Sequence, residues 1–368
     1  MTYIHELGDW PDFRWRTEAL VESLSDVRFQ QGLLLGKMRS LGFPLQAQAT
    51  ISAMTEETIK SSAIEGEILN PESVRSSFAR RLGVPIPKIT PPDQHAEGIV
   101  QVMMDATENF SKALTEERLF AWHAALFPTG YSGLRKIRTG EWREGKMEAV
   151  SGREGNEKIH FEAPLAERVQ HEMQVFLSWF NRADQISPLI KTGLAHLHFL
   201  TIHPFDDGNG RIARAITELS LARIENSAQR FYAMSSEIRD ERKEYYAILE
   251  STQNGELDVT NWLTWFLKCL CLAIERANAL SKAVLEKDIF WRGLEERSIQ
   301  ITERQKQLIN RFLDGFEGKL TTEKWAKIKK ISHDSALRDI QGLIEKGFLK
   351  QGAGRTKGAA YTLILDGL

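Results

Sequence analysis

The chain has 368 residues with a net charge of −2, and apolar side chains make up 42% of it. This length predicts two or three domains with a large core, and the near-neutral charge excludes a protein whose whole surface binds polyanions. The two cysteines, Cys269 and Cys271, lie two positions apart on an expected helix and point in different directions, so we expect neither a disulfide nor a metal site there.

We expect a cytoplasmic location. The low cysteine content suits a reducing compartment, and the first residues lack the pattern of a secretion signal. The best apolar run, from Trp262 to Ile274, is short and is interrupted by Lys268. No membrane span, and therefore no membrane partner, is expected.

Residues 1–92 are expected to form a helical N-terminal region that ends in a proline-rich connection. Within 56–66 the sequence predicts a helix from Thr58 to Glu65, with Gly66 as its C-terminal cap. Glu65 then lies at the negative end of the helix dipole, where a carboxylate needs a compensating cation. The ordinary alternative is a solvated surface glutamate.

Residues 93–297 are expected to form a second, mainly helical domain. Between Gly140 and Pro164 the helical pattern is interrupted, because apolar residues alternate with charged ones on both sides of a turn that contains glycine and asparagine. This alternation predicts a β-hairpin inside the domain.

Two helices joined by a tight loop are predicted further along this domain. Ser187 and Pro188 favour a helix start, and this helix should end near His203 because a residue before proline avoids the helical region. The stretch Gly208-Asn209-Gly210 predicts a turn, and the apolar spacing after it predicts a second helix. The loop therefore leads into a helix N-terminus, where free N–H groups bind anions.

Four side chains of this loop suit phosphate chemistry. Arg211 and Arg214 are three apart, lie on one side of the helix and could bind a polyphosphate through bidentate forks. Asp207 lies at the mouth of the loop, where a Mg²⁺ ion that bridges phosphates needs a carboxylate. His203 is the natural general base, since its unperturbed pKa lies near neutrality.

Each part of the loop also has an ordinary interpretation. A Gly-Asn-Gly sequence alone is usually a turn, and a histidine before proline is usually a helix end. His203 and Asp207 could also be ligands of an unrelated metal site, with His196 and His198 nearby.

The full string from His203 to Arg214 fits HPFx(D/E)GNGRxxR without a mismatch and resembles the signature of the Fic family. The resemblance implies the Fic helical fold and a protein adenylyltransferase, which transfers AMP from ATP to a Tyr, Ser or Thr hydroxyl of a target protein. It implies that His203 is the base and that Asp207 holds Mg²⁺. The residues that would bind the phosphates are Gly208, Asn209 (through its side chain), Gly210, Arg211 and Arg214.

Ser61, Glu65 and Gly66 fit the (S/T)xxxE(G/N) pattern of the Fic inhibitory helix. The resemblance implies that Glu65 pairs with Arg214 and turns it away from the γ-phosphate, so that ATP binds only in an unproductive pose. Because this pattern precedes the motif, the chain resembles the Fic subclass with an N-terminal inhibitory helix.

Two further regions resemble substrate sites of the Fic family. The hairpin near residues 145–161 would be the flap, which holds the target protein by strand addition, although an ordinary surface hairpin has the same pattern. Tyr245 and Tyr246 resemble the segment that borders the adenine pocket, where flat rings suit base stacking. Either tyrosine could equally belong to the core.

Residues 298–368 are expected to form a third domain. Residues 301–368 carry 13 Lys or Arg and 8 Asp or Glu, a net charge of +5. Three predicted helices and a basic, glycine-rich hairpin resemble a winged helix-turn-helix domain, whose third helix enters the major groove of duplex DNA. DNA contacts would come from 333–338 and 355–357, chiefly His333, Ser335, Arg338, Arg355 and Lys357. Use of this surface for protein contacts or dimerisation is equally open.

The sequence thus predicts a mainly α protein that transfers AMP and carries an intrinsic brake. Two alternatives stay open. The same site could use another nucleotide donor or remove AMP from a modified target, or the protein could be a nucleotide-sensing winged-helix regulator that binds DNA. The resemblance also raises the expectation of a homo-oligomer.

Overall fold

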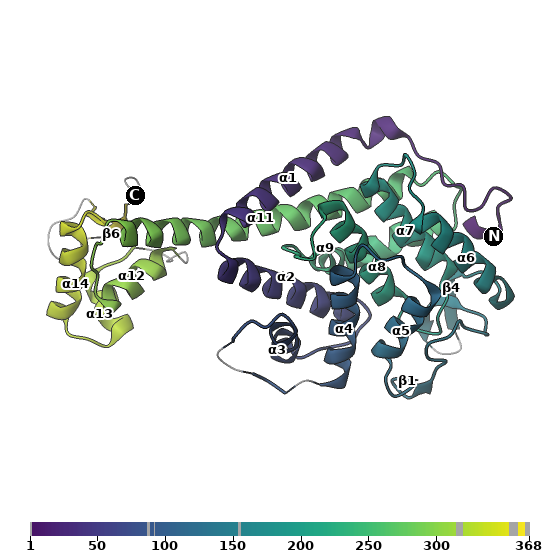
Figure 1. Cartoon of the computed structure of the whole chain (residues 1–368), viewed down its shortest axis with the longest axis horizontal. Coiled ribbons are helices and arrows are strands. Elements are labelled where there is room, and N and C mark those ends of the chain that lie inside the picture. Colours follow the sequence, from purple (N-terminus) through teal and green to yellow (C-terminus); the bar gives the residue numbers. More distant parts are fainter. Residues whose placement is uncertain are drawn as a thin grey trace. The chain divides into compact units, whose positions relative to one another are not determined.

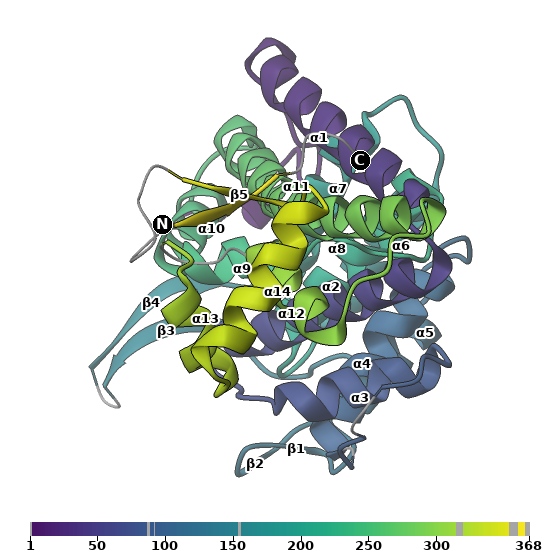
Figure 2. The same cartoon turned by 90° about the vertical axis from the view of Figure 1, so that its left-hand side faces the viewer.

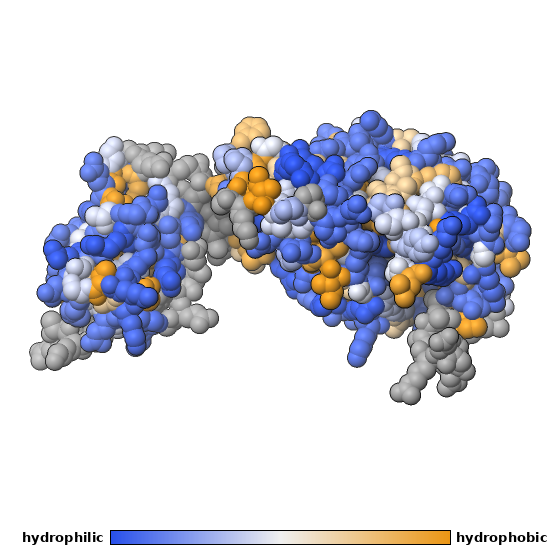
Figure 3. Space-filling view, turned by 90° about the horizontal axis from the view of Figure 1, so that it is seen from below, coloured by the Kyte–Doolittle hydropathy of each residue, from blue (hydrophilic) through white to orange (hydrophobic). Residues whose placement is uncertain are grey.

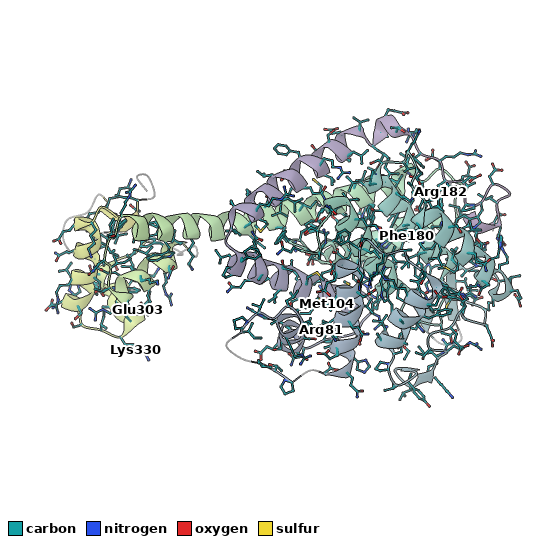
Figure 4. All side chains as sticks on the ribbon, viewed as in Figure 1. Arg81, Met104, Phe180, Arg182, Glu303 and Lys330 are labelled. Carbon is teal, nitrogen blue, oxygen red and sulfur yellow. The ribbon has the colours of Figure 1, made fainter. Side chains whose placement is uncertain are left out.

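The computed structural model describes residues 2–86, 89–91, 93–153, 156–313, 319–352 and 360–364. The chain divides into two compact units, Met1–Asn278 (unit 1) and Ala279–Leu368 (unit 2). Helices dominate both units (Figure 1), which confirms the mainly α fold predicted from the sequence. Side chains fill the interior of each unit (Figure 4). Among the described residues, no helix combines the length and the hydropathy needed to cross a bilayer.

Unit 1 contains two short 3-10 helices and a series of α-helices. The 3-10 helices are Ile4–Glu6 and Thr17–Ala19. The α-helices are α1 (Val21–Ser40), α2 (Phe43–Ile64), α3 (Pro71–Arg81), α4 (Gln94–Glu108), α5 (Glu116–Leu126), α6 (Ala166–Asn181), α7 (Pro188–Ile202), α8 (Asn209–Glu225), α9 (Met234–Asp240) and α10 (Arg242–Gln253). The long helix α11 spans Thr260–Glu296.

The antiparallel pair α7 and α8 forms the centre of unit 1. The neighbours of α8 are α2, α4 and α5, and α6 packs on α7 (Figures 1 and 2). All residues of α7 from Thr192 to Ile202 are buried. Its Gly193 lets α11 approach closely, because a Cβ there would lie 3.1 Å from the Phe266 ring, and the Trp262 indole donates to the Gly193 carbonyl at 2.8 Å. The loop that follows α7 is therefore held on a rigid core.

The α2 helix is longer than the sequence pattern predicts. It begins at Phe43 rather than near Thr58, since Gly42 takes an extended conformation at its start and Pro44 occupies its first turn. The helix ends at Ile64, and Gly66 adopts a left-handed conformation with φ +85°. A glycine at this position ends helices because it has no Cβ to clash there.

Two small hairpins lie beside the helical body of unit 1. Strands β3 (Glu148–Arg153) and β4 (Asn156–Glu162) pair antiparallel, as the alternating pattern predicts. Figure 2 shows this hairpin projecting from the helices. The sequence pattern did not reveal the shorter pair, β1 (Tyr131–Ser132) and β2 (Arg135–Lys136), because two-residue strands have no periodicity.

Unit 2 has its own hydrophobic core, which includes Trp325, Leu308 and Ile340. Its elements after α11 are α12 (Glu303–Leu313), α13 (Thr322–Lys329), α14 (His333–Glu345) and an antiparallel pair of strands, β5 (Leu349–Gln351) and β6 (Tyr361–Leu363). The three helices and the hairpin are present, and the assignment of this unit as a winged helix stays a prediction.

The residues predicted to contact DNA are only partly described. His333 and Arg338 are exposed on α14, and Ser335 is half-buried. Arg355 and Lys357 lie outside the described residues. Hydrophilic side chains predominate on the face of the molecule seen in Figure 3, with only small apolar patches among them.

Candidate functional site

A pocket of about 740 Å³ opens over the loop between α7 and α8. It gathers side chains from the end of α2, from strand β4, from the loop itself and from α10. Among the residues that line it are Glu65, His160, His203, Asp207, Gly210 and Tyr246. The predicted base, metal ligand and inhibitory glutamate therefore share one cavity.

His203 ends α7 in a left-handed conformation, with φ 51° and ψ 60°. Its backbone N–H donates to the Phe199 carbonyl at 3.0 Å. Its ring Nδ1 lies 3.1 Å from the Leu200 carbonyl, which can only accept, so Nδ1 carries the proton and donates. Nε2 thus keeps its lone pair, and burial lowers the pKa of the ring. The imidazole is held as a neutral base.

Arg143 fixes the loop from the other side, and sequence reasoning did not identify it. Its Nε donates to the His203 carbonyl at 2.7 Å, and its other guanidinium nitrogens donate to the carbonyls of Gly145 (2.8 Å), Pro164 (2.5 Å) and Ile202 (3.3 Å). The side chain is buried, and burial lowers its pKa. No local pattern marks an arginine that bonds main-chain carbonyls in two distant segments, at Pro164 and at Ile202 and His203.

Asn209 closes the loop on itself. Its side chain accepts from the Phe205 N–H at 3.0 Å and donates to the Phe205 carbonyl at 2.8 Å. It is 2% exposed, with both ends of the amide engaged. The amide therefore shapes the loop, and a contact between the Asn209 side chain and phosphate stays a prediction.

His123 on α5 supports the loop from below. Its ring stacks on Phe205 with centroids 4.2 Å apart and planes 7° from parallel. Nδ1 accepts from the Gly140 N–H at 3.0 Å, so Nε2 carries the proton and donates to the Asp207 carbonyl at 3.2 Å. Burial lowers the pKa of His123 to about 4, so the ring stays neutral. A single histidine on a helix gave no signal of this role.

Asp207 presents its carboxylate at the mouth of the pocket. One oxygen accepts from the Gly208 N–H at 2.5 Å and the other accepts from the Ser132 hydroxyl. Within the described residues there is no group of three or more His, Cys, Asp or Glu side chains that could hold a metal, and both ring nitrogens of His196 are bonded to Thr217 and Tyr245. A single carboxylate does suit Mg²⁺, which usually binds one or two carboxylates together with substrate phosphates.

The N-terminus of α8 is crowded by Glu65. A Cβ on Gly210 would lie 2.0 Å from Glu65 Oε1 and 3.2 Å from Arg214 Nη1. Only glycine therefore fits at this position while Glu65 is in place. The carboxylate lies directly over the backbone where free N–H groups and the positive end of the helix dipole attract anions.

Arg214 is anchored by the end of α2. Nε donates to the Ser61 hydroxyl at 2.7 Å, and Nη2 donates to the Ser61 carbonyl at 2.8 Å and to Glu65 Oε1 at 2.7 Å. Burial lowers the pKa of Arg214, and the nearby Glu65 charge raises it. The second effect prevails, so the pKa of Arg214 lies above its usual value. The three predicted inhibitory residues thus meet here, with Gly66 forming the turn that follows Glu65.

Arg211 is held by a different carboxylate. Nη1 donates to Glu67 Oε2 at 2.6 Å, and the guanidinium carbon lies 4.8 Å from the centre of the Phe127 ring. In the part of the chain that the structure describes, Arg211 Nε and Arg214 Nη1 are buried donors without a hydrogen-bond partner. Buried donors are rarely left unpaired, so two such guanidinium nitrogens beside one helix N-terminus fit a site for a polyphosphate.

The two tyrosines of α10 differ in their surroundings. Tyr245 is 1% exposed, and its hydroxyl is bonded to His196 Nε2 at 3.0 Å, so this ring belongs to the core. This disfavours the stacking role expected for Tyr245. Tyr246 is 41% exposed and lines the pocket, with Arg242 5.5 Å from the centre of its ring. An open ring face is thus available at Tyr246 alone of the pair.

Strand β4 forms one wall of the pocket and is attached to α10. Asn254 donates to the His160 carbonyl at 2.9 Å, and His160 Nδ1 lies 2.8 Å from Glu250 Oε1. The end of the hairpin at His160 is therefore held in place beside the pocket that contains His203.

Comparisons with known proteins find matches over parts of this chain. Residues 113–221 match the Fic/DOC family, and residues 3–84 match a domain of unknown function (DUF4172). The chain is 29% identical over 108 residues to the protein adenylyltransferase Fic of Nematostella vectensis, covering 29% of this chain and 23% of the relative. It is 31% identical over 93 residues to the protein adenylyltransferase fic-1 of Caenorhabditis elegans, covering 25% of this chain and 17% of the relative. The chain therefore matches less than a quarter of either relative.

Solved structures share the fold. A Fic family protein from Desulfovibrio desulfuricans aligns over 96% of this chain and 98% of its own, with 23% identity and a TM-score of 0.52. A Fic domain containing signaling protein from Bacteroides thetaiotaomicron aligns over 70% of this chain and 98% of its own, with 18% identity and a TM-score of 0.53. These structures show the fold alone, and the Fic/DOC match over residues 113–221, which includes the complete loop motif on α7 and α8, identifies a Fic domain within the chain.

Proposed function

We propose that this protein is an adenylyltransferase that moves AMP from ATP onto a Tyr, Ser or Thr hydroxyl of a target protein. The observation that carries the proposal is the meeting of three features in one pocket. These are a neutral histidine with a free Nε2 (His203), a carboxylate (Asp207) and a helix N-terminus flanked by buried arginines. The adenylyltransferase names of two relatives support the same reaction.

His203 would start the reaction as general base. Its Nε2 takes the proton of the target hydroxyl, and the hydroxyl oxygen forms a bond to the α-phosphorus of ATP. The bond between that phosphorus and the oxygen that bridges to the β-phosphate breaks, and pyrophosphate leaves. A positioned base of this kind accelerates such reactions by ~10²–10⁴-fold.

The remaining residues of the loop would bind charge. Arg211, Arg214 and the backbone N–H groups at Gly208 and Gly210 are placed to neutralise the β- and γ-phosphates. Asp207 would hold Mg²⁺, which when bound supplies further neutralisation of the phosphates. The exposed ring of Tyr246 would stack on the adenine.

Glu65 would act as a brake on this reaction. Its carboxylate occupies the space above Gly210 and bonds to Arg214, so it takes both the anion position and one of the cations that the γ-phosphate needs. ATP would then bind only with its terminal phosphate displaced. The target protein would lie along the hairpin at residues 145–161, whose base borders the pocket.

Incorporation of label from α-³²P-ATP with Mg²⁺ tests the proposal. We expect label on protein with Glu65→Gly, little with the unchanged protein and none with Glu65→Gly/His203→Ala. No label with Glu65→Gly across a range of ATP concentrations would overturn it. Glu65-dependent release of AMP from a labelled target would instead favour AMP removal, the alternative use of the site.

Unit 2 supports a separate proposal, namely binding of duplex DNA through α14. His333 and Arg338 are exposed there, and the region from 301 to 368 carries a net charge of +5. Affinity for duplex DNA that falls steeply with salt is expected, and its loss in His333→Ala/Arg338→Ala tests the contact. Salt-independent or absent binding would favour a protein partner for this surface.

A further inference from the structure

Glu67 pairs with Arg211 at the start of α8, as Glu65 pairs with Arg214 one turn further along the helix. Its Oε2 accepts from Arg211 Nη1 at 2.6 Å, and its Oε1 lies 3.6 Å from Nδ1 of His95. The Arg211 side chain is 7% exposed and that of Glu67 is 27% exposed. Each of the two arginines expected to bind phosphate is therefore paired with a glutamate from the same short segment.

The turn at the end of α2 fixes both glutamates together. The Gly66 N–H donates to the Ala63 carbonyl at 3.1 Å, and the Glu67 N–H donates to the Ser62 carbonyl at 3.0 Å. These two bonds around a left-handed glycine are those of a Schellman motif, which sets the backbone on both sides of the glycine. A displacement of this turn would withdraw both carboxylates from the site together.

Arg211 also has a buried N–H group that donates to no protein acceptor among the described residues. Its Nε is buried and has no hydrogen-bond partner within the described residues, although Nη1 is bonded to Glu67. Glu67 also holds the guanidinium by Nη1, so an anion can reach only its remaining N–H groups while the pair is intact. Release of Glu67 would free Nη1 as a further donor and remove a negative charge that competes with phosphate.

We propose that Glu67 is a second controlling residue of this site, which competes with phosphate for Arg211 as Glu65 competes for Arg214. The inference rests on the proposed function, since it needs a polyphosphate in the pocket. It extends that function because removal of Glu65 alone frees Arg214 but leaves Arg211 paired with Glu67. Both arginines become free for phosphate only when both carboxylates leave.

Binding of ATP by a His203→Ala protein, which cannot turn over, measures the effect without catalysis. In this background we compare Glu65→Gly, Glu67→Gln and the double variant, with adenosine as a ligand that has no phosphate. Glu67→Gln is expected to tighten ATP binding about 5-fold and to leave adenosine unchanged, since partly exposed ion pairs contribute up to about 1 kcal/mol. The double variant should bind ATP more tightly than Glu65→Gly.

Glu97→Gln is the matched control, because Glu97 pairs with Arg80 and Arg81 away from the loop. It should leave binding of both ligands unchanged. If Glu67→Gln leaves ATP affinity unchanged or weakens it while Glu65→Gly strengthens it, Glu67 merely positions Arg211 and the inference is wrong while the proposed function stands. If no variant binds ATP, the proposed function and the inference both fall.

Discussion

The backbone of His203 determines what its ring can do. A left-handed residue that is not glycine carries a conformational cost of roughly 1 kcal/mol, which surrounding contacts must offset. The four carbonyl acceptors of Arg143 include that of His203, and the Nδ1 contact to Leu200 fixes the ring. Together these contacts fix the proton on Nδ1 and leave Nε2 as the base.

The pH dependence of transfer should report this environment. Burial lowers the pKa of His203, and the neutral ring is the active form, so activity should persist at a lower pH than an ordinary histidine would allow. In Glu65→Gly, kcat/KM should rise with pH with its midpoint below pH ~6.5, the usual pKa of histidine. A rise centred at or above that value would contradict the assignment, provided that the His203→Ala background is subtracted.

Gly210 should be required for nucleotide binding even without the brake. An added Cβ would fill the space now taken by Glu65 Oε1, 2.0 Å away, which is also the space proposed for phosphate. In a Glu65→Gly background, Gly210→Ala should weaken ATP binding by about 10-fold or more, equal to ~1.4 kcal/mol. Titration calorimetry measures this loss.

Gly32→Ala on α1 is the control for Gly210→Ala, since nothing lies within 4 Å of a Cβ there. It should leave ATP affinity unchanged. ATP affinity in Gly210→Ala equal to that of this control would place the phosphates away from the α8 N-terminus.

At the scale of elements, the site depends on how α7, α8 and the end of α2 meet. His203 at the end of α7 contributes the base, the first turns of α8 contribute the arginines, and the turn after α2 contributes the carboxylates that hold them. The segment between the two hairpins contributes Arg143, which ties the loop to the base of β3 through Gly145. We therefore expect activity to be lost if the loop, or the segments that hold it, change their conformation.

Loss of Arg143 should damage both stability and activity. Arg143→Leu leaves four main-chain carbonyls without their guanidinium donors, and an unsatisfied buried acceptor costs about 1–3 kcal/mol. We expect a lower Tm and transfer activity reduced by more than 10-fold even at temperatures where the protein is folded. Thermal unfolding and label incorporation measure the two effects.

Arg135→Leu, at an exposed position of the neighbouring hairpin, is the control for Arg143→Leu. It should change neither the Tm nor the activity. Normal activity in folded Arg143→Leu would mean that the loop keeps its shape without this side chain.

The parts of the site that the sequence predicts are those whose residues are contiguous. His203, Asp207 and the two arginines stand in one string, so spacing alone places them on a helix end, a loop and a helix start. Arg143, His123, Ser132 and Glu67 come from distant segments, and their partners are set by tertiary packing that no local pattern encodes. The burial of the Tyr245 ring and of the Asn209 amide is likewise not encoded locally, because tertiary packing decides which side chains are covered.

The mainly α class and the hairpin were predictable because helical and alternating periodicity are strong over many residues. The start of α2 at Phe43 could not be predicted, because alanine, threonine and serine along its first turns give no clear apolar stripe. The two-residue strands β1 and β2 are too short for any pattern. The sequence pattern therefore does not predict very short strands or contacts between residues that are far apart in the chain.

At the scale of the molecule, the two units have separate hydrophobic cores. The core of unit 2 centres on Trp325, which is fully buried and whose indole donates to Asp339 at 3.2 Å. Arg304 pairs with the same carboxylate. A separate core predicts that unit 2 unfolds without loss of the nucleotide pocket.

Trp325→Ala tests this independence. Truncation of a buried tryptophan costs about 3–5 kcal/mol, enough to unfold a unit of this size. We expect calorimetry to show a transition lost or shifted to lower temperature while ATP binding by the Glu65→Gly background stays unchanged. Loss of ATP binding together with that transition would mean that the two cores unfold as one.

The carboxylate of Glu65 can also be considered as a ligand tethered to its own receptor. A group attached by a short connection competes at a fixed effective concentration, on the order of millimolar, however dilute the protein is. Free nucleotide must therefore displace a carboxylate that never diffuses away. On the proposed function, the turn at Gly66 would thus raise the ATP concentration at which the pocket is half occupied, by a factor set by the geometry of the turn.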